Sequence, residues 1–479
     1  MAGGARCSTR KIFSKDPFSM IEVTAPASKS FSHRYLIAAA LASGTSTIHN
    51  VLDSNDTTCT REILSLAGAR FTPLAGGSWQ VQGTMGKLLG GKTEPLSCYV
   101  HESGTTCRLL TAVLASGKGN FRIHGAPRMH ERPMGFLVNA LRALGCDIVC
   151  EEREGFAPLQ IRTRGIRANN LPAQEHVGMH ALAVSMDESS QYFSGLLLAS
   201  PQAEEMITLV LGGSHVVSWP YIGLTLQCMH DFGVKFLVET REHVDDDWLA
   251  ADWRTLSHVE PMCLRVKVQP GPYRAGDFYV EGDWSGASYL VAAGALGRQA
   301  TRVKGVRTDS LQGDRALINI IQDMGAKLTS SDNGITITPT PLHGVDVDMS
   351  QCPDLVPTVA VLAAFANGTT RISNVAHLRI KETDRIKAPA NALRSIGVKV
   401  EEKEDGLVIE GMGSDVRLNL QGKRFATSND HRMAMSQALF ALKANDVRAP
   451  EMFRLMDDPK VVNKSFPDFW KTFEAFVDD

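Results

Sequence analysis

Basic side chains recur next to small polar residues along this chain. Lys29 directly follows Ser28, Arg432 comes two residues after Asp430, and Arg108 comes five residues after a serine. Serine and aspartate are preferred N-cap residues of helices. The backbone N–H groups at a helix start attract anions, and each helix dipole contributes about 0.3–1 kcal/mol. Because cations gathered in one cleft repel one another unless an anion completes the cluster, this pattern predicts a site for phosphate and carboxylate groups.

A second basic pattern lies in the charged run at 379–385. If this run is helical, Lys381 and Arg385 lie one turn apart on the same face, and the same holds for Arg128 and Arg132. Like charges so placed disfavour a helix by about 0.2–0.5 kcal/mol, and a bound anion would reverse that sign. Taken alone, the run also fits a solvated charged turn or helix face.

Two acids, Glu382 and Asp354, are the residues best placed to move a proton, because each lies beside the predicted anion site in the sequence. Each also fits a helix cap or a salt-bridge partner. His431 fits either a proton carrier or a structural histidine. Tyr221, at a predicted helix start, fits either a contact to a ring substrate or core packing.

These residues are positioned by a unit that recurs six times, roughly every 70 to 95 residues. In each copy a polar cluster leads into an Ala/Leu-rich helix, such as 35–42, 109–115 or 290–296, which is apolar nearly all round as in a buried helix. A strand, a second helix and a hairpin follow, with hairpin turns expected at 76–77, 154–155, 333–334 and 405–406. The clusters are Ser28-Lys29-Ser30, Glu102-Ser103-Gly104, Glu188-Ser189-Ser190, Asp283-Trp284-Ser285, Cys352-Pro353-Asp354 and Asn429-Asp430-His431, and the C-cap glycines that end the second helices are Gly68, Gly145, Gly233, Gly325 and Gly397.

The sixth copy ends after its second helix, expected at 466–476, so its closing strands must come from elsewhere. The strand around 20–23 is the expected donor. Residues 27–280 then form one domain, and residues 1–26 join 281–479 in a second, discontinuous domain. With three parallel buried helices in each domain, two sets of helix N-termini would face each other across a cleft. The acidic, Trp-containing segment 239–261 departs from the repeat and is expected to be a surface insertion.

Composition excludes several classes of function. The chain has 479 residues and a net charge of -2, which gives no overall basic field for nucleic acid or an anionic membrane. The longest apolar stretches, 35–42 and 355–366, are too short or interrupted to span a bilayer. Nine cysteines without a Cys-x-x-Cys pair fit reduced thiols in a cytoplasmic protein. Without a glycine-rich phosphate loop or a His/Cys metal spacing, we expect no nucleotide, metal or other cofactor.

The basic first fifteen residues hint at a transit peptide, but they lack a longer Ser/Arg-rich leader. They therefore favour an unstructured extension.

Taken in order, the motifs resemble the 5-enolpyruvylshikimate-3-phosphate synthase family of enolpyruvyl transferases. The resemblance covers nearly the whole chain. It implies an α/β fold of two similar domains, each an inside-out barrel of three βαβαββ units with buried parallel helices. The matching blocks are Ser28 through Arg34, Ser103 through Arg108, Pro127 through Pro133, Ser189 through Gln191, Ser218 through Tyr221, Glu281 through Asp283, Lys381 through Arg385, Asp430 through Ala434 and Lys464 through Asp468.

The resemblance also implies transfer of the enolpyruvyl group of phosphoenolpyruvate to the 5-hydroxyl of shikimate 3-phosphate, with release of phosphate, in the shikimate pathway to chorismate. Asp354 would take the hydroxyl proton, and Lys29 or Glu382 would protonate the methylene carbon. The residues implied to hold shikimate 3-phosphate are Lys29, Ser30, Arg34, Ser189, Ser190, Gln191, Ser218, Tyr221, Asp354, His377 and Lys381. Those implied to hold phosphoenolpyruvate are Lys29, Gly104, Arg128, Gln191, Arg385, Arg432 and Lys464.

Five positions depart from the commoner family pattern. Glu102 and His377 stand where asparagine is frequent, Thr106 where alanine is, Leu109 where proline is, and Trp219 where a basic residue often occurs. The changes near Gly104 adjoin the region where glyphosate competes with phosphoenolpyruvate in the family. We therefore predict altered glyphosate sensitivity, which an inhibition constant typical of sensitive enzymes would refute.

Two alternatives remain open. One is the sister enzyme that transfers enolpyruvyl to UDP-N-acetylglucosamine. That family has Lys-Asn where this chain has Lys29-Ser30, and it usually carries a loop cysteine that is missing between Cys107 and Cys146. The other is a non-catalytic relative that binds phosphorylated ligands, although binding alone would not need the acids. We expect a monomer whose partners are small molecules rather than nucleic acid or membrane.

Overall fold

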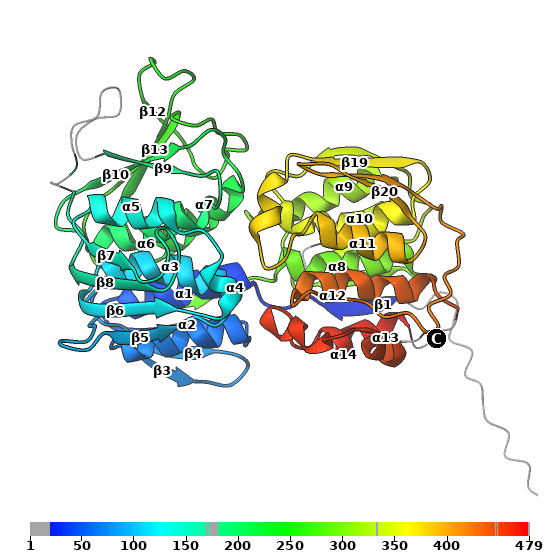
Figure 1. The fold of residues 1–479 in the computed structure, drawn as a ribbon, viewed down its shortest axis with the longest axis horizontal. Helices are drawn as coiled ribbons and strands as arrows, with labels where there is room; N and C mark the ends of the chain where they lie inside the picture. Colours follow the sequence, from blue (N-terminus) through cyan, green and yellow to red (C-terminus); the bar gives the residue numbers. More distant parts are fainter. Residues whose placement is uncertain are drawn as a thin grey trace, which may run out of the picture.

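The computed structural model describes residues 20–168, 171, 181–331, 334–445, 447 and 449–477. It consists of two lobes that lie side by side, one coloured from blue to green and the other from light green to red in Figure 1. Each lobe has its own apolar core, one drawn from Phe31 to Val280 and the other from Val23, Ala25 and residues between Trp284 and Phe473. Asn333, in one expected hairpin, and the basic first fifteen residues lie outside the described part of the chain.

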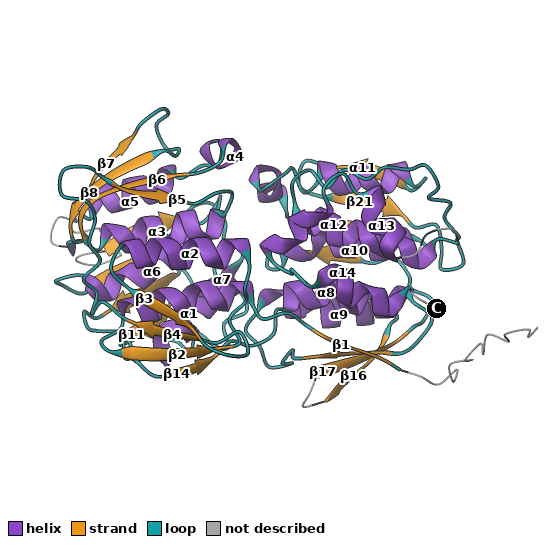
Figure 2. Ribbon diagram, turned by 90° about the horizontal axis from the view of Figure 1, so that it is seen from below, coloured by secondary structure: helices purple, strands orange, loops and turns teal. Residues whose placement is uncertain are grey.

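Helices form the interior of both lobes, and Figure 2 shows them stacked between layers of strands. The first helix of each copy is buried as predicted. α1, α3, α8 and α12 begin within the polar cluster, so α1 begins at Lys29 and not at 35, whereas α6 and α10 begin after it. The first lobe contains α1 (Lys29–Leu41), α2 (Asn55–Leu66), α3 (Gly104–Ala115), α4 (Pro127–His130), α5 (Gly135–Ala143), α6 (Gln191–Ala199) and α7 (Trp219–Asp231). The second contains α8 (Trp284–Leu296), α9 (Leu317–Asp323), α10 (Val356–Ala364), α11 (Lys387–Ser395), α12 (His431–Ala438), α13 (Ala449–Leu455) and α14 (Phe469–Phe473).

Small mixed sheets surround the first lobe, in the orders β14-β2-β4-β3, β5-β6-β8-β7 and β12-β11-β13-β10-β9. In each sheet a parallel strand joins an antiparallel set, for example β14 on β2. The strands are β2 (Thr45–His49), β3 (Arg70–Pro73), β4 (Trp79–Gln82), β5 (Leu96–Tyr99), β6 (Lys118–His124), β7 (Asp147–Cys150), β8 (Leu159–Arg164), β9 (Ala181–Ser185), β10 (Ile207–Gly212), β11 (Phe236–Thr240), β12 (Leu249–Ala250), β13 (Leu264–Val268) and β14 (Asp277–Tyr279).

The second lobe has two sheets of the same kind among its described residues, ordered β1-β15-β17-β16 and β18-β19-β21-β20. Its strands are β1 (Ile21–Thr24), β15 (Thr301–Lys304), β16 (Lys327–Ser331), β17 (Gly334–Thr338), β18 (Asp346–Asp348), β19 (Thr369–Ser373), β20 (Lys399–Glu402) and β21 (Leu407–Glu410). The hairpins expected at 76–77, 154–155 and 405–406 are present between β3 and β4, β7 and β8, and β20 and β21.

The second helices end as predicted, at glycines with positive φ. The φ angles are +117° at Gly68, +88° at Gly145, +72° at Gly233, +95° at Gly325 and +95° at Gly397. A side chain with a Cβ is strained in this left-handed region. The glycine therefore fixes where each helix stops and a strand begins.

The lobes exchange strands where the chain crosses between them. β1 precedes the first lobe in sequence but pairs in parallel with β15 of the second lobe, while β14 pairs with β2 of the first. The two crossing segments bind each other through Ser28 N to Glu281 O at 2.8 Å and Asp283 N to Pro26 O at 2.7 Å.

The predicted destination of the N-terminal strand was therefore wrong. β1 completes the sheet of the fourth copy, not that of the sixth. In the described part of the sixth copy, strand pairing is limited to isolated bridges, Leu418 with Ala444 and Phe425 with Met456. Because these bridges form no continuous ladder, they offer no edge on which a fourth strand can pair.

Two further predictions need correction. The last helix, expected at 466–476, is shorter, since α14 covers Phe469–Phe473 and passes into a 3-10 turn at Glu474–Phe476. The insertion expected at 239–261 begins later, because Glu239 and Thr240 still belong to β11. It projects from the first lobe around β12 (Figure 1), although Trp253 within it is buried.

Within the described ranges, no helix combines the length and apolarity needed to cross a membrane. The same residues contain no cluster of three or more His, Cys, Asp or Glu side chains arranged to hold a metal ion. The described cysteines are free thiols.

Candidate active site

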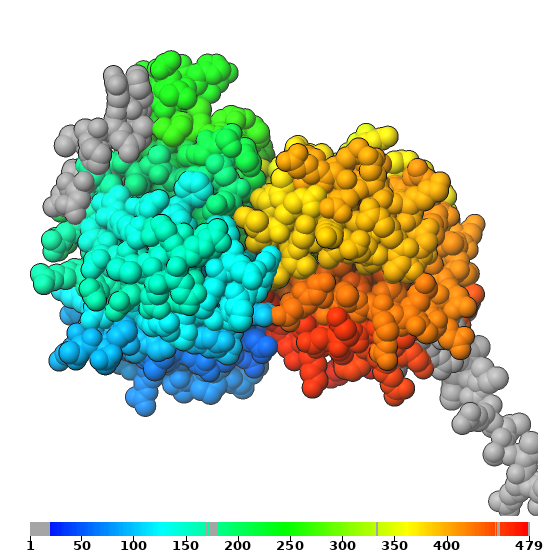
Figure 3. All heavy atoms as spheres, in the orientation of Figure 1, coloured from blue at the N-terminus to red at the C-terminus, as the bar shows by residue number. Residues whose placement is uncertain are grey.

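A polar cavity of about 80 Å³ lies where the two lobes meet, at the narrow waist seen in Figure 3. Helix starts from both lobes form its wall, including those of α1, α6 and α7 on one side and α8 and α12 on the other. The sequence-predicted residues that line it are Lys29, Ser30, Ser189, Ser190, Gln191, Ser218, Tyr221, Asp354, Lys381, Glu382, Arg385 and Arg432. Residues far apart in sequence are thus brought to one place.

Side chains cap α1, α3, α8 and α12 as the sequence predicts, whereas Ser190 before α6 and the cluster 352–354 before α10 make no side-chain cap hydrogen bond. The Ser28 hydroxyl accepts from Phe31 N at 3.4 Å and the Ser103 hydroxyl from Thr106 N at 3.2 Å. Asp283 caps α8 in the same way. A satisfied cap fixes the first turn of each helix, and it thereby fixes the side chains that follow it at the cavity wall.

Arg385 is the centre of the charge network. Its Nε lies 2.7 Å from Asp430 Oδ2, its Nη1 lies 2.9 Å from Asp354 Oδ1 and its Nη2 lies 3.0 Å from Glu382 Oε2. The Arg385 side chain is 3% exposed and that of Asp430 is 0% exposed. Because an unpaired charge at this depth is costly, each group holds the other in place.

Asp354 is held by two arginines and a tyrosine. Arg432 Nη2 lies 2.6 Å from its Oδ2, and the Tyr221 hydroxyl donates to Oδ2 at 2.9 Å. Burial acts to raise the pKa of Asp354, but Arg432 and Arg385 outweigh it and hold that pKa below its ordinary value. The carboxylate is therefore ionised, with its oxygens turned toward the cations that would meet an anionic ligand.

Glu382 is the second acid of the cavity. Its carboxylate lies 3.0 Å from Arg385, 3.2 Å from Lys464 and 3.7 Å from Arg132. Burial opposes ionisation, but Arg385 and Lys464 hold the pKa of Glu382 well below its ordinary value. Glu382 therefore acts like a bound anion, because its carboxylate neutralises the cations around it.

Two lysines at the cavity have lowered pKa values. Burial lowers the pKa of Lys29, whose Nζ lies 3.7 Å from Asp56. Burial and then Arg108 lower the pKa of Lys381 to about 7. Lys381 can therefore take up or release a proton near neutral pH.

Gln191 contacts Arg108 and Thr105, two residues that were not among the implied substrate contacts. Its Oε1 accepts from Arg108 Nη1 at 3.1 Å, and its Nε2 donates to Thr105 at 3.0 Å. Arg108 and Arg132 both line the cavity and are nearly fully buried. Arg108 and Arg132 could have been identified from the sequence, because they belong to the basic patterns that first indicated an anion site.

The geometry assumed for the paired basic residues was wrong. Lys381 has extended backbone angles (φ -84°, ψ -157°) at the end of a 3-10 helix, and α11 begins only at Lys387. α4 ends at His130, so Arg132 lies outside it. The residue before a proline disfavours helical angles, and Pro133 follows. The cations still converge, but through turns rather than along one helix face.

Several predicted residues lie behind the wall. Arg34 is 2% exposed and donates to Thr225 Oγ1, Ser30 O and Tyr221 O, so it supports the backbone of two lining residues. Gly104 packs under Arg132, whose guanidinium atoms would lie 2.5–2.7 Å from an added Cβ.

The side chains of Arg128 and Lys464 each donate a hydrogen bond to the opposite lobe. Arg128 Nη2 donates to Lys381 O at 3.1 Å, and Lys464 Nζ donates to Glu102 O at 3.3 Å. Asn429 reaches the same Glu102 through its side chain at 2.5 Å. These contacts hold the lobes together around the cavity.

The assignment of His377 to shikimate 3-phosphate stays a prediction. This residue lines a neighbouring hollow together with His215 and Asp348 rather than the polar cavity. Burial and then Lys381 lower its pKa to about 3, so the ring is neutral. His431, by contrast, lines the cavity, is 1% exposed, and has its pKa held well below the ordinary value by burial and Lys29.

The departures near Gly104 point away from the cavity. The Thr106 hydroxyl lies 2.8 Å from both Ser103 Oγ and Thr60 Oγ1, and Leu109 is fully buried. Trp219 is buried as well, and its Nε1 donates to Leu256 O at 2.8 Å.

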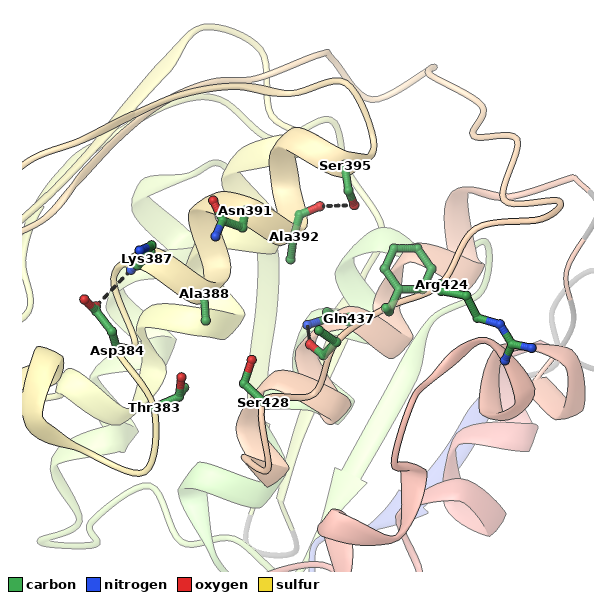
Figure 4. Close-up of a pocket in the computed structure, with 12 residues that line it drawn as sticks. Thr383, Asp384, Lys387, Ala388, Asn391, Ala392, Ser395, Arg424, Ser428 and Gln437 are labelled. Carbon is green, nitrogen blue, oxygen red and sulfur yellow. Dashed lines mark hydrogen bonds between the residues drawn. The ribbon is translucent and has the colours of Figure 1, made fainter. Parts of the chain in front are cut away.

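A larger hollow of about 370 Å³ lies between α11 and the segment that leads into α12 (Figure 4). Asp384 there accepts from the N–H groups of Ile386 and Lys387 and so caps α11. The cations and acids of the network converge on the smaller cavity, so we assign the chemistry there.

Comparison with known proteins gives a consistent result. A family model described as EPSP synthase (3-phosphoshikimate 1-carboxyvinyltransferase) matches residues 20–245 and 258–473. The break between these ranges lies inside the segment predicted to be an insertion. A protein named 3-phosphoshikimate 1-carboxyvinyltransferase from Paraburkholderia phymatum is 38% identical over 473 residues, which is 96% of this chain and 98% of the relative. One of the same name from Paraburkholderia phytofirmans is 39% identical over 470 residues, with the same coverage.

A solved structure of EPSP synthase from Acinetobacter baumannii superposes with a TM-score of 0.68 at 23% identity and covers 95% of each chain. At that identity the match bears on the fold, and it confirms the predicted two-domain, inside-out α/β class. Since relatives above 30% identity align over almost the entire length, the chain belongs to the EPSP synthase (3-phosphoshikimate 1-carboxyvinyltransferase) family, a family of transferases.

Proposed function

We propose that the interlobe cavity transfers the enolpyruvyl group of phosphoenolpyruvate to the 5-hydroxyl of shikimate 3-phosphate, with release of phosphate. One observation carries the proposal. The acids Asp354 and Glu382 reach the same closed cavity as Lys29, Lys381 and Arg385. A site that only bound anions would be weakened by acids in its wall, whereas a site that also moves protons requires them.

The charges of the substrates match those of the cavity. The two molecules together bring two phosphates and two carboxylates, and these anions would take the place of Asp354 and Glu382 as partners of the cations in the network. We assign shikimate 3-phosphate to Lys29, Ser30, Ser189, Ser190, Gln191, Ser218, Tyr221, Asp354 and Lys381, with Arg34 supporting Ser30 and Tyr221 from behind. We assign phosphoenolpyruvate to Lys29, Gln191, Arg385 and Arg432 in the wall, with Gly104, Arg128 and Lys464 next to it.

The first chemical step joins the two substrates. The 5-hydroxyl oxygen bonds to C2 of phosphoenolpyruvate and loses its proton to Asp354, while C3 gains a proton. With Arg432 at 2.6 Å and Arg385 at 2.9 Å from its carboxylate, Asp354 is a weak base. Anionic groups of phosphoenolpyruvate that engage these arginines would draw them away from Asp354 and raise its basicity.

The proton for C3 comes from Lys29 or Glu382. The pKa of Glu382 is held well below its ordinary value, which leaves it without a proton to give, whereas burial lowers the pKa of Lys29 and makes its ammonium a stronger acid. This difference favours Lys29. In the second step C3 returns a proton, the C2–O bond to phosphate breaks and the enol double bond forms again.

Closure of the lobes would keep water from the cationic centre that develops at C2. The Tyr221–Asp354 bond and the contact from Ser218 N to Ser350 O at 3.1 Å both span the lobes beside the cavity. We propose that residues 27–280 form the domain on the shikimate 3-phosphate side. Residues 1–26 and 281–479 would form the one on the phosphoenolpyruvate side. We further propose that the protein is a cytoplasmic monomer that needs no cofactor.

Phosphate release from phosphoenolpyruvate tests the proposal, with shikimate 3-phosphate or UDP-N-acetylglucosamine as the acceptor. We expect turnover with the first acceptor only. Lys29→Met should reduce it by about 10²-fold or more, and Lys87→Met, at an exposed surface lysine, serves as the matched control. Turnover with the nucleotide sugar, or tight binding of both substrates without phosphate release, would support one of the two alternatives instead.

A further inference from the structure

A third carboxyl group lies close behind the cavity and takes no part in the chemistry proposed above. Asp314 belongs to the 3-10 helix η3 (Gly313–Ala316) and is 2% exposed. Its Oδ2 accepts a hydrogen bond from the hydroxyl of Ser285. Its Oδ1 is also buried, and it has no hydrogen-bond partner among the described residues.

Ser285 connects this acid to the charge network. It lies in the first turn of α8 and lines the cavity. Its hydroxyl oxygen lies 3.4 Å from Arg432 Nη2, and the same nitrogen lies 2.6 Å from Asp354 Oδ2. The contacts thus run from Asp314 through Ser285 and Arg432 to the proposed base.

The 3-10 helix that carries Asp314 is fixed against the other lobe. An added Cβ on Gly313 would lie 3.0 Å from the Pro220 side chain and 2.6 Å from Gln351 O. Pro220 stands in the first turn of α7, next to Tyr221, which bonds to Asp354. The position of Asp314 is therefore set at the junction of the lobes and depends on their closure.

We propose that Asp314 is a positioning residue for this reaction, which through Ser285 holds the Arg432 guanidinium against Asp354. The inference rests on the proposed function, since it assigns a role within that same site. Nothing in the chemistry requires Asp314 to touch a substrate, so it acts through its neighbours.

The electrostatic surroundings of Asp314 support this role. The charged and titratable groups facing it are Asp354 from the 3-10 helix η4 (Pro353–Leu355), Arg432 from α12, Asp283 at the start of α8, and Tyr221 from α7. Cys352 lies beside it as well, as a neutral thiol. Burial, followed by Asp354, raises the pKa of Asp314 to about 7, while Arg432 opposes the rise.

Asp314 is thus neutral below about pH 7 and carries a negative charge above it. A new negative charge beside Arg432 weakens the attraction of that arginine for an anionic substrate. The KM for phosphoenolpyruvate should therefore rise with pH in the parent enzyme. Lys381 also titrates in this range, so the informative quantity is the ratio of the parent KM to that of an Asp314 variant.

The test compares steady-state kinetics of the full chain from about pH 5.5 to about pH 9. Asp314→Asn keeps the shape and an acceptor for Ser285 but cannot ionise. We expect the KM ratio of parent to variant to be constant below about pH 6 and to increase about tenfold above about pH 8, as one added charge would produce. Asp309→Asn, at an acid whose side chain is 70% exposed, is the matched control and should give a constant ratio.

Ser285→Ala provides a second, independent variant. It removes the link while Asp314 remains, so the KM for phosphoenolpyruvate should rise about two- to tenfold at every pH. Thermal unfolding of both variants shows that they are folded. A pH-independent KM ratio for Asp314→Asn together with an unchanged KM for Ser285→Ala would overturn the inference while leaving the proposed function intact. Failure of the parent enzyme to turn over would overturn both.

Discussion

Replacement of Asp354 by asparagine should separate binding from chemistry. Its carboxylate lies 2.9 Å from Arg385 and 2.6 Å from Arg432, two of the cations proposed to bind phosphoenolpyruvate. Substrate anions must therefore compete with it. Asp354→Asn removes the competing charge but keeps an oxygen that can accept from Tyr221, so the shape of the site should persist.

The size of the effect follows from the two ion pairs. At an effective dielectric constant of about 20, a pair of unit charges about 4 Å apart interacts by about 4 kcal/mol. Much of this is offset because the asparagine oxygen still accepts hydrogen bonds and the guanidinium groups gain solvent. A remainder of about 1.4 kcal/mol corresponds to about tenfold tighter binding of phosphoenolpyruvate. Turnover should nevertheless fall by about 10²- to 10⁴-fold, the usual contribution of a positioned base.

Calorimetric titration with phosphoenolpyruvate in the presence of shikimate 3-phosphate measures the affinity, and phosphate release measures turnover. Asp346→Asn, at an exposed acid paired with Arg371, serves as the control. Weaker binding would show that Asp354 does not compete with the substrate, and unchanged turnover would show that it is not the base.

The stability of the same variant should depend on pH. Arg432 and Arg385 hold the pKa of Asp354 below its ordinary value. The ionised carboxylate therefore stabilises the fold above the ordinary carboxyl pKa of about 4, and this contribution is lost as the pH falls below it. We expect the parent to have the higher Tm near neutral pH, with the difference shrinking below about pH 4.

Three further changes test other parts of the network. Gly104→Ala would push its Cβ into the Arg132 guanidinium, which lies within 2.5–2.7 Å, so the KM for phosphoenolpyruvate should rise about tenfold while kcat changes less, and an unchanged KM would contradict this. Lys381, whose pKa is lowered to about 7, loses its charge as the pH rises, so calorimetry should show affinity for shikimate 3-phosphate falling above about pH 7 in the parent but not in Lys381→Gln. Asp430→Asn leaves Arg385 without its closest partner and should lower the free energy of unfolding by about 3–5 kcal/mol in denaturant titrations, whereas a loss below about 1 kcal/mol would argue against the buried pair.

The repeats could be predicted from short-range sequence signals that mark where helices begin and end. Helix caps such as Ser28 and Asp430, and the C-cap glycines, depend on residues within a few positions of one another, and the structure confirms them. The partner of β1 depends on a pairing with β15, far away in sequence. The strand was assigned to the sixth copy because that copy ends without closing strands, and the sequence alone does not reveal that its described part lacks a regular ladder.

The basic residues predicted an anion-binding cavity, but the sequence did not predict which acids neutralise these cations. The helix assumed through Lys381 and Arg385 overlooked Asp384, which caps α11 and so places the helix start after the basic pair. Cap residues ahead of an Ala-rich segment are a known start signal, so this boundary was open to prediction. Glu382 lies three residues before Arg385, but that Asp354 also neutralises Arg385 could be seen only once two distant segments were brought together.

The exchanged strands bear on how the protein is made. β1 leaves the ribosome long before its register partners, which begin only at Thr301. At about 5–20 residues per second, synthesis leaves β1 without its partner strand for roughly 15 to 60 s. During that interval the nascent chain carries an unpaired strand edge, which is a point of attachment for chaperones and equally a starting point for aggregation.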